Sequence, residues 1–307
     1  SVGTGASAIQ YVPAIAPQVS ELYVLQRTPP WVVPHSARPV SAFERSVYRR
    51  FPLAQRAVRG GIYSTRELLV LGFVKRPSLL RVLERGAARH RANGLGGDPA
   101  LIARTTPDYR LGCKRILPSN AWYPALARPN VTLVDSGLAA LRPGGVVTAD
   151  GRSLDVDAVV FGTGFHVVDM PIASLVRGRD GRSLAEVWDG SPRAHAGATV
   201  PGFPNFFMLL GPNTGLGHSS MIYMIESQID YVMAALRAAD VVEVRPEAVA
   251  RFNADVQRRM QGTVWNTGCR SWYLDASGRN PTLWPDWTWR FRRAAARFDP
   301  ADYVLSG

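Results

Sequence analysis

Cysteine is nearly absent from this sequence, whose 307 residues include two, Cys113 and Cys269. Two cysteines are too few for the disulfide framework of a small secreted domain, so reduced thiols in a cytoplasmic protein are expected. Long apolar runs are lacking as well, because the most apolar stretch, residues 68–74, is far too short to cross a bilayer. Hydrophobic residues still make up 46% of the chain, which is enough to bury one large core or two moderate ones.

The residue patterns typical of several reaction classes are missing from this sequence. No Cys and His spacing suggests a metal site, and no Gly-x-Ser-x-Gly nucleophile elbow of a hydrolase is present. His166 and His218 are the only histidines inside recognisable motifs, and both are expected to pack or to form hydrogen bonds. The sequence therefore argues against metal-dependent chemistry and serine hydrolysis.

Positive charge is concentrated in one segment. The net charge is +12, and residues 38–115 hold 17 Lys and Arg but only 5 Asp and Glu. A solvated basic helical face is the plainest interpretation, while a phosphate-rich cofactor and weak association with an anionic membrane surface are alternatives. Nucleic acid is not expected as a partner, because no recognisable binding motif accompanies the basic residues.

The chain opens on a glycine motif. Residues 3–8 read Gly-Thr-Gly-Ala-Ser-Ala, which fits the G-x-G-x-x-A pattern of dinucleotide-binding folds. Gly3 would make the turn out of a strand, Gly5 would let the backbone approach a pyrophosphate, and Ala8 would let the next helix pack closely. That helix is expected over residues 6–15, with the amide groups at its start holding the phosphates.

The residues after the next expected strand indicate which dinucleotide binds. A strand is predicted over residues 21–26, and Arg27 and Thr28 follow it where an NAD-selective enzyme places an acidic residue. A guanidinium instead suits the 2′-phosphate of NADP. The alternative is an ordinary surface arginine after a strand. Only Ser1 and Val2 precede Gly3 although a glycine turn needs a strand before it, so the sequence is expected to be truncated at its N-terminus.

Downstream patterns predict an α/β chain with a helical insertion. Helical spacing fills about residues 38–105, whereas β-branched runs, turn residues and a 3.6-residue period mark the later elements. The expected elements are strands at 131–134, 140–141, 146–148, 156–161 and 206–210 and helices at about 219–237 and 246–261.

The motifs taken together resemble the class B flavin-dependent monooxygenases, and most closely the Baeyer–Villiger type related to 4-hydroxyacetophenone and cyclohexanone monooxygenases. The resemblance runs almost from end to end, and the order and spacing of its pieces make it specific. Its main motifs lie at residues 3–10, 24–31, 112–115, 157–165, 211–218 and 272–280.

The resemblance implies a three-layer Rossmann-like FAD- and NAD(P)-binding fold whose FAD half is incomplete in this chain. Residues 1–150 would form the NADP domain, and residues 151–307 the C-terminal part of the FAD domain. It further implies that NADPH reduces FAD, and that O₂ then gives a C4a-peroxyflavin that inserts one oxygen atom into a ketone. Because the family's FAD fingerprint is not in this sequence, the chain by itself is expected to bind FAD poorly. Alternatives are N- or S-oxygenation, a non-catalytic NADP-binding fragment and a chain that works with a complementing N-terminal fragment.

Site residues follow from the resemblance residue by residue. Arg115 would lie beside the flavin as the catalytic cation, because a guanidinium cannot lose its proton there. A structural ion pair is the alternative for the Lys114–Arg115 dipeptide, and Trp122 stands where the family often has tyrosine. The cofactor-binding residues implied are Gly3, Thr4, Gly5, Ala6, Ser7, Gln10, Arg27, Thr28, Lys114, Thr163, Gly164, Asn213 and Thr214.

Overall fold

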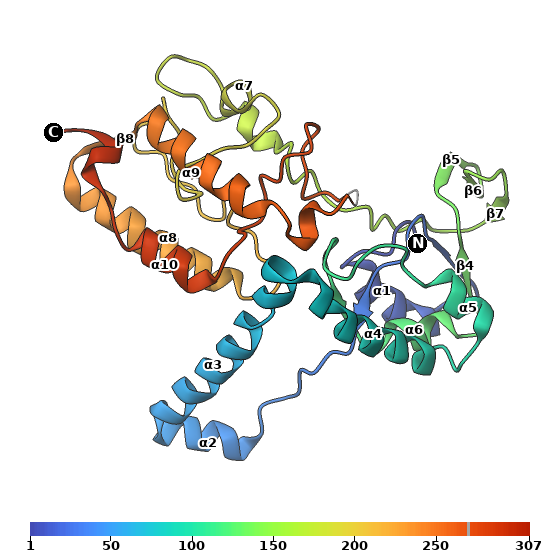
Figure 1. Ribbon diagram of the computed structural model, residues 1–307. Coiled ribbons are helices and arrows are strands. Elements are labelled where there is room, and N and C mark those ends of the chain that lie inside the picture. The colour runs from blue at the N-terminus through green and yellow to red at the C-terminus, as the bar shows by residue number, and fades with distance from the viewer. Residues whose placement is uncertain (269–270) are drawn as a thin grey trace. The chain divides into compact units, whose positions relative to one another are not determined.

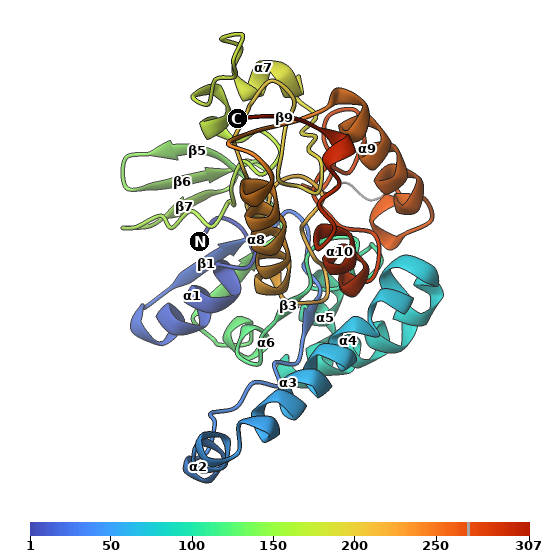
Figure 2. The same ribbon diagram turned by 90° about the vertical axis from the view of Figure 1, so that its left-hand side faces the viewer.

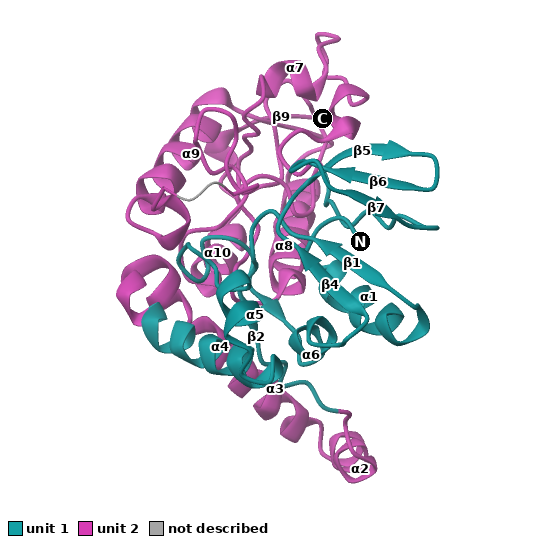
Figure 3. Ribbon diagram, turned by 90° about the vertical axis from the view of Figure 1, so that its right-hand side faces the viewer, with its two compact units in different colours: residues 1–38, 80–165 teal, residues 39–79, 166–307 magenta. Residues whose placement is uncertain are grey.

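The computed structural model describes residues 1–268 and 271–307, and it divides into two compact units. The first unit comprises Ser1–Arg38 and Leu80–Phe165, and the second comprises Pro39–Leu79 and His166–Gly307 (Figure 3). These boundaries differ from the expected division near residue 150, because part of the helical insertion belongs with the C-terminal residues. Which unit binds which cofactor stays a prediction.

A small parallel sheet organises the first unit. Strand β1 (Leu22–Leu25) pairs in parallel with β4 (Val131–Val134), and Val2 bridges in parallel to both Leu25 and Phe161. Helix α1 (Ala8–Ile15) packs on this sheet, since its buried residues share one core cluster with Val24 and Leu133 (Figure 2). A strand, a glycine turn, a helix and a parallel strand give a mixed α/β arrangement of the Rossmann type. The expected helix and both strands are confirmed here, to within two residues.

The rest of the first unit surrounds this sheet. A three-stranded antiparallel sheet β5–β6–β7 contains the strands predicted at 140–141 and 146–148, which form a hairpin, and a short parallel pair joins β2 to β3. These elements are β2 (Val32–Val33), α4 (Leu80–Gly94), α5 (Pro99–Arg104), β3 (Leu117–Pro118), α6 (Trp122–Leu126), β5 (Leu138–Arg142), β6 (Gly145–Thr148) and β7 (Ser153–Asp155).

Two predicted strands are absent from the described residues. Residues 156–161 form a single bridge, in which the Val2 amide donates to the Val160 carbonyl and the Gly162 amide donates to the Val2 carbonyl. Residues 206–210 are irregular, and the amide of Leu210 donates to the side chain of Gln228 rather than to a strand. Both runs have the composition of strands, but a strand forms only where a partner backbone continues its ladder.

The second unit is built on two helices packed side by side, α8 (Met221–Ala238) and α10 (Thr288–Ala295) (Figure 1). Strand β8 (Val241–Val244) pairs antiparallel with β9 (Tyr303–Ser306) and shares its core with these helices. The predicted helices near 219–237 and 246–261 are confirmed, the second as α9 (Pro246–Met260) with a proline in its first turn. Helix α7 (Leu184–Trp188) packs in a separate cluster.

Helices α2 (Ala42–Arg50) and α3 (Pro52–Glu67) precede a π-helical turn (Leu71–Lys75) in this unit. Ser41 and Glu44 form a capping box that starts α2. Neither helix buries a hydrophobic side chain, and Phe43 and Leu53 are among those left exposed. Within the described residues of both units, the 3₁₀ segments are Ala16–Gln18, Pro77–Leu79, Pro171–Ser174, Val264–Asn266 and Pro300–Asp302.

The cysteine prediction needs correction. Cys113 is buried and disulfide-bonded, so the expectation of a reduced thiol is wrong at this position. Cys269 lies outside the described residues. No helix in the described ranges is both long enough and apolar enough to cross a membrane.

Candidate functional site

Gly3 sits where the parallel strands of the first unit end. Its amide donates to the carbonyl of Leu25, its φ is +104°, and a Cβ added to it would lie 2.5 Å from the carbonyl oxygen of Gly162. Any side chain here would collide with backbone, so only glycine fits. Gly5 is different, because a Cβ added there would meet no atom within 4 Å. Gly5 therefore leaves open space beside the backbone, which a ligand would need in order to approach it closely.

The start of α1 offers hydrogen-bond donors. Ser7 occupies the N-cap without a capping bond from its side chain, and no acceptor is recorded among the described residues for the amides of Ala6, Ser7 and Ala8. Thr4 is buried, and its hydroxyl donates to the carbonyl of Thr28 at 3.4 Å, which ties the glycine turn to the loop after β1. Open amides at a helix N-terminus suit an anion such as pyrophosphate.

The Gln10 side chain is used locally, since its amide donates to the carbonyl of Ala6 at 2.8 Å. The bond spans one helical turn on the exposed side of α1. Contact between Gln10 and a cofactor therefore remains a prediction.

Arg27 and Lys114 are brought together in the first unit. Arg27 follows β1, and its side chain passes over Gly137, where an added Cβ would lie 3.4 Å from the Arg27 Cδ. The Lys114 ammonium lies 4.6 Å from the centre of the Tyr109 ring. Burial lowers the pKa of Lys114, and the nearby charge of Arg27 lowers it further, against an opposing effect of Asp108. That the two cations bind an anion stays a prediction.

The loops that carry these cations are held to each other. The Trp31 indole donates to the carbonyl of Tyr109 at 2.7 Å, and the Tyr109 hydroxyl donates to the carbonyl of Pro29 at 3.1 Å. The loop after β1 and the segment before Lys114 are thus cross-linked by two hydrogen bonds. These bonds hold together the two backbone segments from which the cations project.

Arg115 projects from the same segment with an exposed side chain. Throughout residues 1–268 and 271–307, no salt bridge is recorded for Lys114 or for Arg115. The alternative of a structural ion pair therefore has no support, and Arg115 is a cation available to a ligand. Whether that ligand is flavin stays a prediction.

The remaining residues predicted to contact a cofactor differ in their exposure to solvent. Thr163 and Gly164 are exposed at the end of the first unit, and Gly164 has a φ of +93°. Asn213 and Thr214 belong to the second unit and are almost fully buried. The Asn213 amide donates to the carbonyls of Asn280 and Leu283 at 2.8 and 3.0 Å, and the Thr214 hydroxyl donates to the carbonyl of Gly211 at 2.7 Å. These two side chains shape their loop, and the backbone amides of Asn213 and Gly215 donate to other carbonyls of the chain, so contact of this loop with a cofactor stays a prediction.

Sequence reasoning missed a buried cluster around Glu67, at the end of α3. The Glu67 carboxylate accepts hydrogen bonds from the backbone amide and the hydroxyl of Thr288, at 2.5 and 2.8 Å, and lies 3.7 Å from Nε2 of His218. Thr288 is the first residue of α10, so the carboxylate caps that helix. His218 is fully buried, as its motif led us to expect. No local signal marks Glu67, because its partners lie far along the chain.

Replacing Glu67 with alanine is expected to lower the free energy of unfolding by about 3 kcal/mol. The change leaves the buried His218 without its carboxylate neighbour and removes the cap at the start of α10. Burial by itself raises the pKa of Glu67, but the hydrogen bonds from Thr288 and the nearby ring of His218 outweigh it, so the pKa falls below its ordinary value. The carboxylate thus stabilises the fold above the ordinary pKa, and this is lost as the pH falls through the lowered value. Denaturant unfolding of the native chain and of Glu67→Gln should differ at pH 7 and converge in acid, whereas a constant difference would contradict the pairing.

Comparison with known proteins shows which proteins this chain resembles. No family model matches the chain. A Baeyer–Villiger monooxygenase of Streptomyces coelicolor is 53% identical over 99% of this chain and 60% of its own length, and one of Pseudomonas aeruginosa is 49% identical over 99% of this chain and 59% of its own length. The chain thus spans about three fifths of these relatives.

Solved structures agree on the fold. An oxidized steroid monooxygenase bound to NADP superposes with a TM-score of 0.81 at 27% identity, covering 99% of this chain and 66% of its own. A closed cyclohexanone monooxygenase has a TM-score of 0.79 at 24% identity, covering 99% of this chain and 66% of its own, which supports the fold alone. Along almost its whole length, the chain is therefore similar to the matching part of Baeyer–Villiger monooxygenases.

Proposed function

We propose that this chain supplies the NADP-binding and catalytic-cation part of an NADPH- and FAD-dependent monooxygenase that inserts one oxygen atom of O₂ into a ketone. The observation that carries the proposal is that Arg27 precedes Thr28, whose carbonyl is tied to Thr4 of the glycine turn, and that Lys114 lies near enough for the charge of Arg27 to lower its pKa. The names of the relatives favour the ketone as the substrate class.

The residues fit NADP in this proposal. The open amides of Ala6 and Ser7 would bind the pyrophosphate, and the space beside Gly5 would admit it. Arg27 and Lys114 would bind the 2′-phosphate, where an extra anion relieves the repulsion between them. Thr28 would orient that end of the ligand, because its carbonyl already fixes Thr4.

The fit to FAD is weaker. The polar groups of Asn213 and Thr214 bond within the chain. Among the described residues, 156–161 form only one isolated bridge and 206–210 form no strand. We therefore propose that the 307-residue chain alone holds FAD poorly, which corresponds to an incomplete FAD half. Bound FAD would supply the activation of O₂, and Arg115 would stabilise negative charge beside it. A purified chain that carries stoichiometric flavin absorbance would refute the weak-binding proposal.

The activity is best tested in a chimera in which this chain replaces the matching three fifths of the Streptomyces relative. NADPH consumption should then depend on added ketone and yield an ester or lactone. A chimera that oxidises a sulfide but no ketone would favour S-oxygenation, and an NADPH-binding but inactive chimera would favour a non-catalytic role. If activity appears only when the relative's N-terminal part is added as a separate polypeptide, a complementing fragment is indicated.

The two glycines give a matched pair of variants. Gly3→Ala should destabilise the first unit by more than about 1 kcal/mol, because the methyl group meets the Gly162 carbonyl at a positive φ. Gly5→Ala should leave stability within about 0.5 kcal/mol and weaken NADP⁺ binding, because its methyl group would occupy only the space of the ligand. Thermal unfolding and calorimetric titration measure both effects. Equal losses of stability would contradict the different roles assigned to the two positions.

Weak association with an anionic membrane surface remains a separate proposal. Its support is that α2 and α3 expose Phe43, Phe51 and Leu53 among basic side chains. Failure of the chain to float with vesicles rich in phosphatidylserine at low salt would rule it out.

A further inference from the structure

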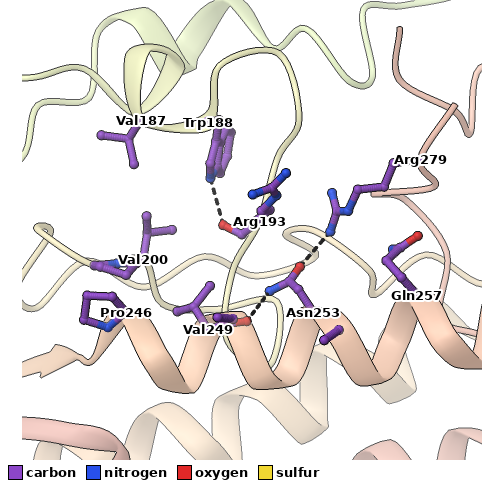
Figure 4. A pocket seen from close by; sticks show the side chains of 12 residues that line it. Val187, Trp188, Arg193, Val200, Pro246, Val249, Asn253, Gln257 and Arg279 are labelled. Atoms are coloured by element: carbon purple, nitrogen blue, oxygen red, sulfur yellow. Dashed lines mark hydrogen bonds between the residues drawn. The ribbon is translucent and has the colours of Figure 1, made fainter. Parts of the chain in front are cut away.

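A cavity of about 430 Å³ lies along α9 in the second unit, and its lining includes none of the residues assigned to NADP or FAD. One wall comes from α9 and the other from residues 187–201, with Arg279 at one end (Figure 4). This volume falls within the range of about 300–1,000 Å³ that is typical of small-molecule sites. The cavity is therefore large enough for a ligand of its own.

One end of the cavity is apolar. Val187, Val200, Pro246 and Val249 lie together at this end in Figure 4, beside the ring of Trp188. The Trp188 indole donates to the carbonyl of Arg193 at 2.8 Å, so its only polar atom is already bonded. A hydrocarbon group placed here would lose contact with water at no cost in hydrogen bonds.

The other end holds a fixed guanidinium. Arg279 donates to the side-chain oxygen of Asn253 at 2.7 Å and to the carbonyl of Pro192 at 2.9 Å. Asn253 is itself buried and donates to the carbonyls of Ala194 and Val249. Burial lowers the pKa of Arg279 to about 10, and the charge of Arg193 contributes to the shift. The two guanidinium groups are thus close enough to repel each other.

Neither cation is neutralised by a direct contact. The nearby carboxylate of Asp275 accepts from the hydroxyls of Ser191 and Ser277, at 2.6 and 2.7 Å, and from the backbone amide of Arg279 at 3.0 Å. In the described parts of the chain no salt bridge joins Asp275 to a guanidinium, and no bond of the Arg193 guanidinium is recorded. The cavity lining contains no Asp or Glu. The charge of Asp275 offsets part of the downward shift in the pKa of Arg279, and two cations facing one nearby carboxylate leave net positive charge at this end of an apolar cavity.

We propose that this cavity binds a small amphipathic carboxylate, with its anionic group between Arg193 and Arg279 and its hydrocarbon tail among Val187, Val200 and Val249. A neutral ligand would leave the repulsion between the two cations in place, and a cationic ligand would increase it. A carboxylate satisfies the free donors of Arg193 and accepts charge-assisted hydrogen bonds. The apolar end requires a tail, which distinguishes this ligand from an inorganic anion.

Octanoate is a suitable probe, with 1-octanol and octylammonium as ligands of the same tail length. Titration calorimetry on the 307-residue chain should show binding of octanoate, weaker binding of octanol and none of octylammonium. Octanoate affinity should fall as salt is added. Equal affinity for octanoate and octanol would overturn the proposal and leave an apolar cavity without charge selection, and absence of octanoate binding would also overturn it.

Variants locate the site. Arg193→Gln should weaken octanoate binding about tenfold, because an exposed charge-assisted contact is lost. The control Arg258→Gln removes the same charge from an exposed position on α9 outside the lining, and should leave affinity within about twofold. Ala254→Leu fills the cavity without changing charge and should abolish binding. Arg279 is kept intact because its hydrogen bonds hold the wall. Equal effects of Arg193→Gln and Arg258→Gln would place the ligand elsewhere.

Discussion

A chain carrying both Arg27→Gln and Lys114→Gln is expected to bind NADP⁺ about 100-fold more weakly than the native chain, while its affinity for NAD⁺ changes by less than about twofold. Each cation would contribute a charge-assisted hydrogen bond to the 2′-phosphate, worth about 1.5 kcal/mol or more. NAD⁺ has no phosphate at that position, so its binding affinity should not depend on these two cations. Titration calorimetry with both dinucleotides measures the difference.

The control for this double variant removes two charges elsewhere in the first unit. Arg85→Gln with Arg89→Gln lowers the net charge equally from exposed positions on α4. It should weaken NADP⁺ binding by less than about threefold, because distant surface charges are screened. If this control loses as much affinity as the Arg27 and Lys114 variant, the effect is one of overall charge and the proposed 2′-phosphate site is wrong.

The second large effect is expected at Arg115. In the chimera, Arg115→Ala should lower ketone oxygenation about 100-fold, which is typical for the loss of one group that stabilises transition-state charge. The side chain is exposed and has no recorded ion pair in the described ranges, so its removal should cost little stability. NADP⁺ affinity should stay unchanged, because Lys114 and Arg27 remain.

Arg115→Lys distinguishes the role of charge from that of the guanidinium. A lysine restores positive charge but not the flat, permanently protonated fork, so partial recovery with a new dependence on alkaline pH is expected. Product yield for each NADPH consumed is the measurement. Full activity of Arg115→Ala in product formation would remove Arg115 from the catalytic assignment.

The elements that sequence predicted well carry local signals. Helix α1 follows a glycine turn, α9 begins at Pro246, and the hairpin between β5 and β6 contains Pro-Gly-Gly, so neighbouring residues specify each structure. Residues 156–161 and 206–210 were predicted as strands from composition and are irregular. A strand depends on a partner that its own residues do not encode.

The same distinction applies to the sites. Arg27 could be proposed from sequence because it lies just after a strand that itself follows a glycine turn, and its role stays a prediction. Glu67 was not, since its carboxylate meets Thr288 and His218 only after the chain has folded. The cavity at Arg193 and Arg279 was missed for the same reason, because its walls come from separate segments.

The most direct test of the central claim is the affinity of the unmodified 307-residue chain for NADP⁺ and for NAD⁺ under identical salt conditions. The two ligands differ only in the 2′-phosphate, so the comparison isolates the cations that bind it. NADP⁺ should bind at least tenfold more tightly. Equal affinities, or tighter binding of NAD⁺, would contradict the account.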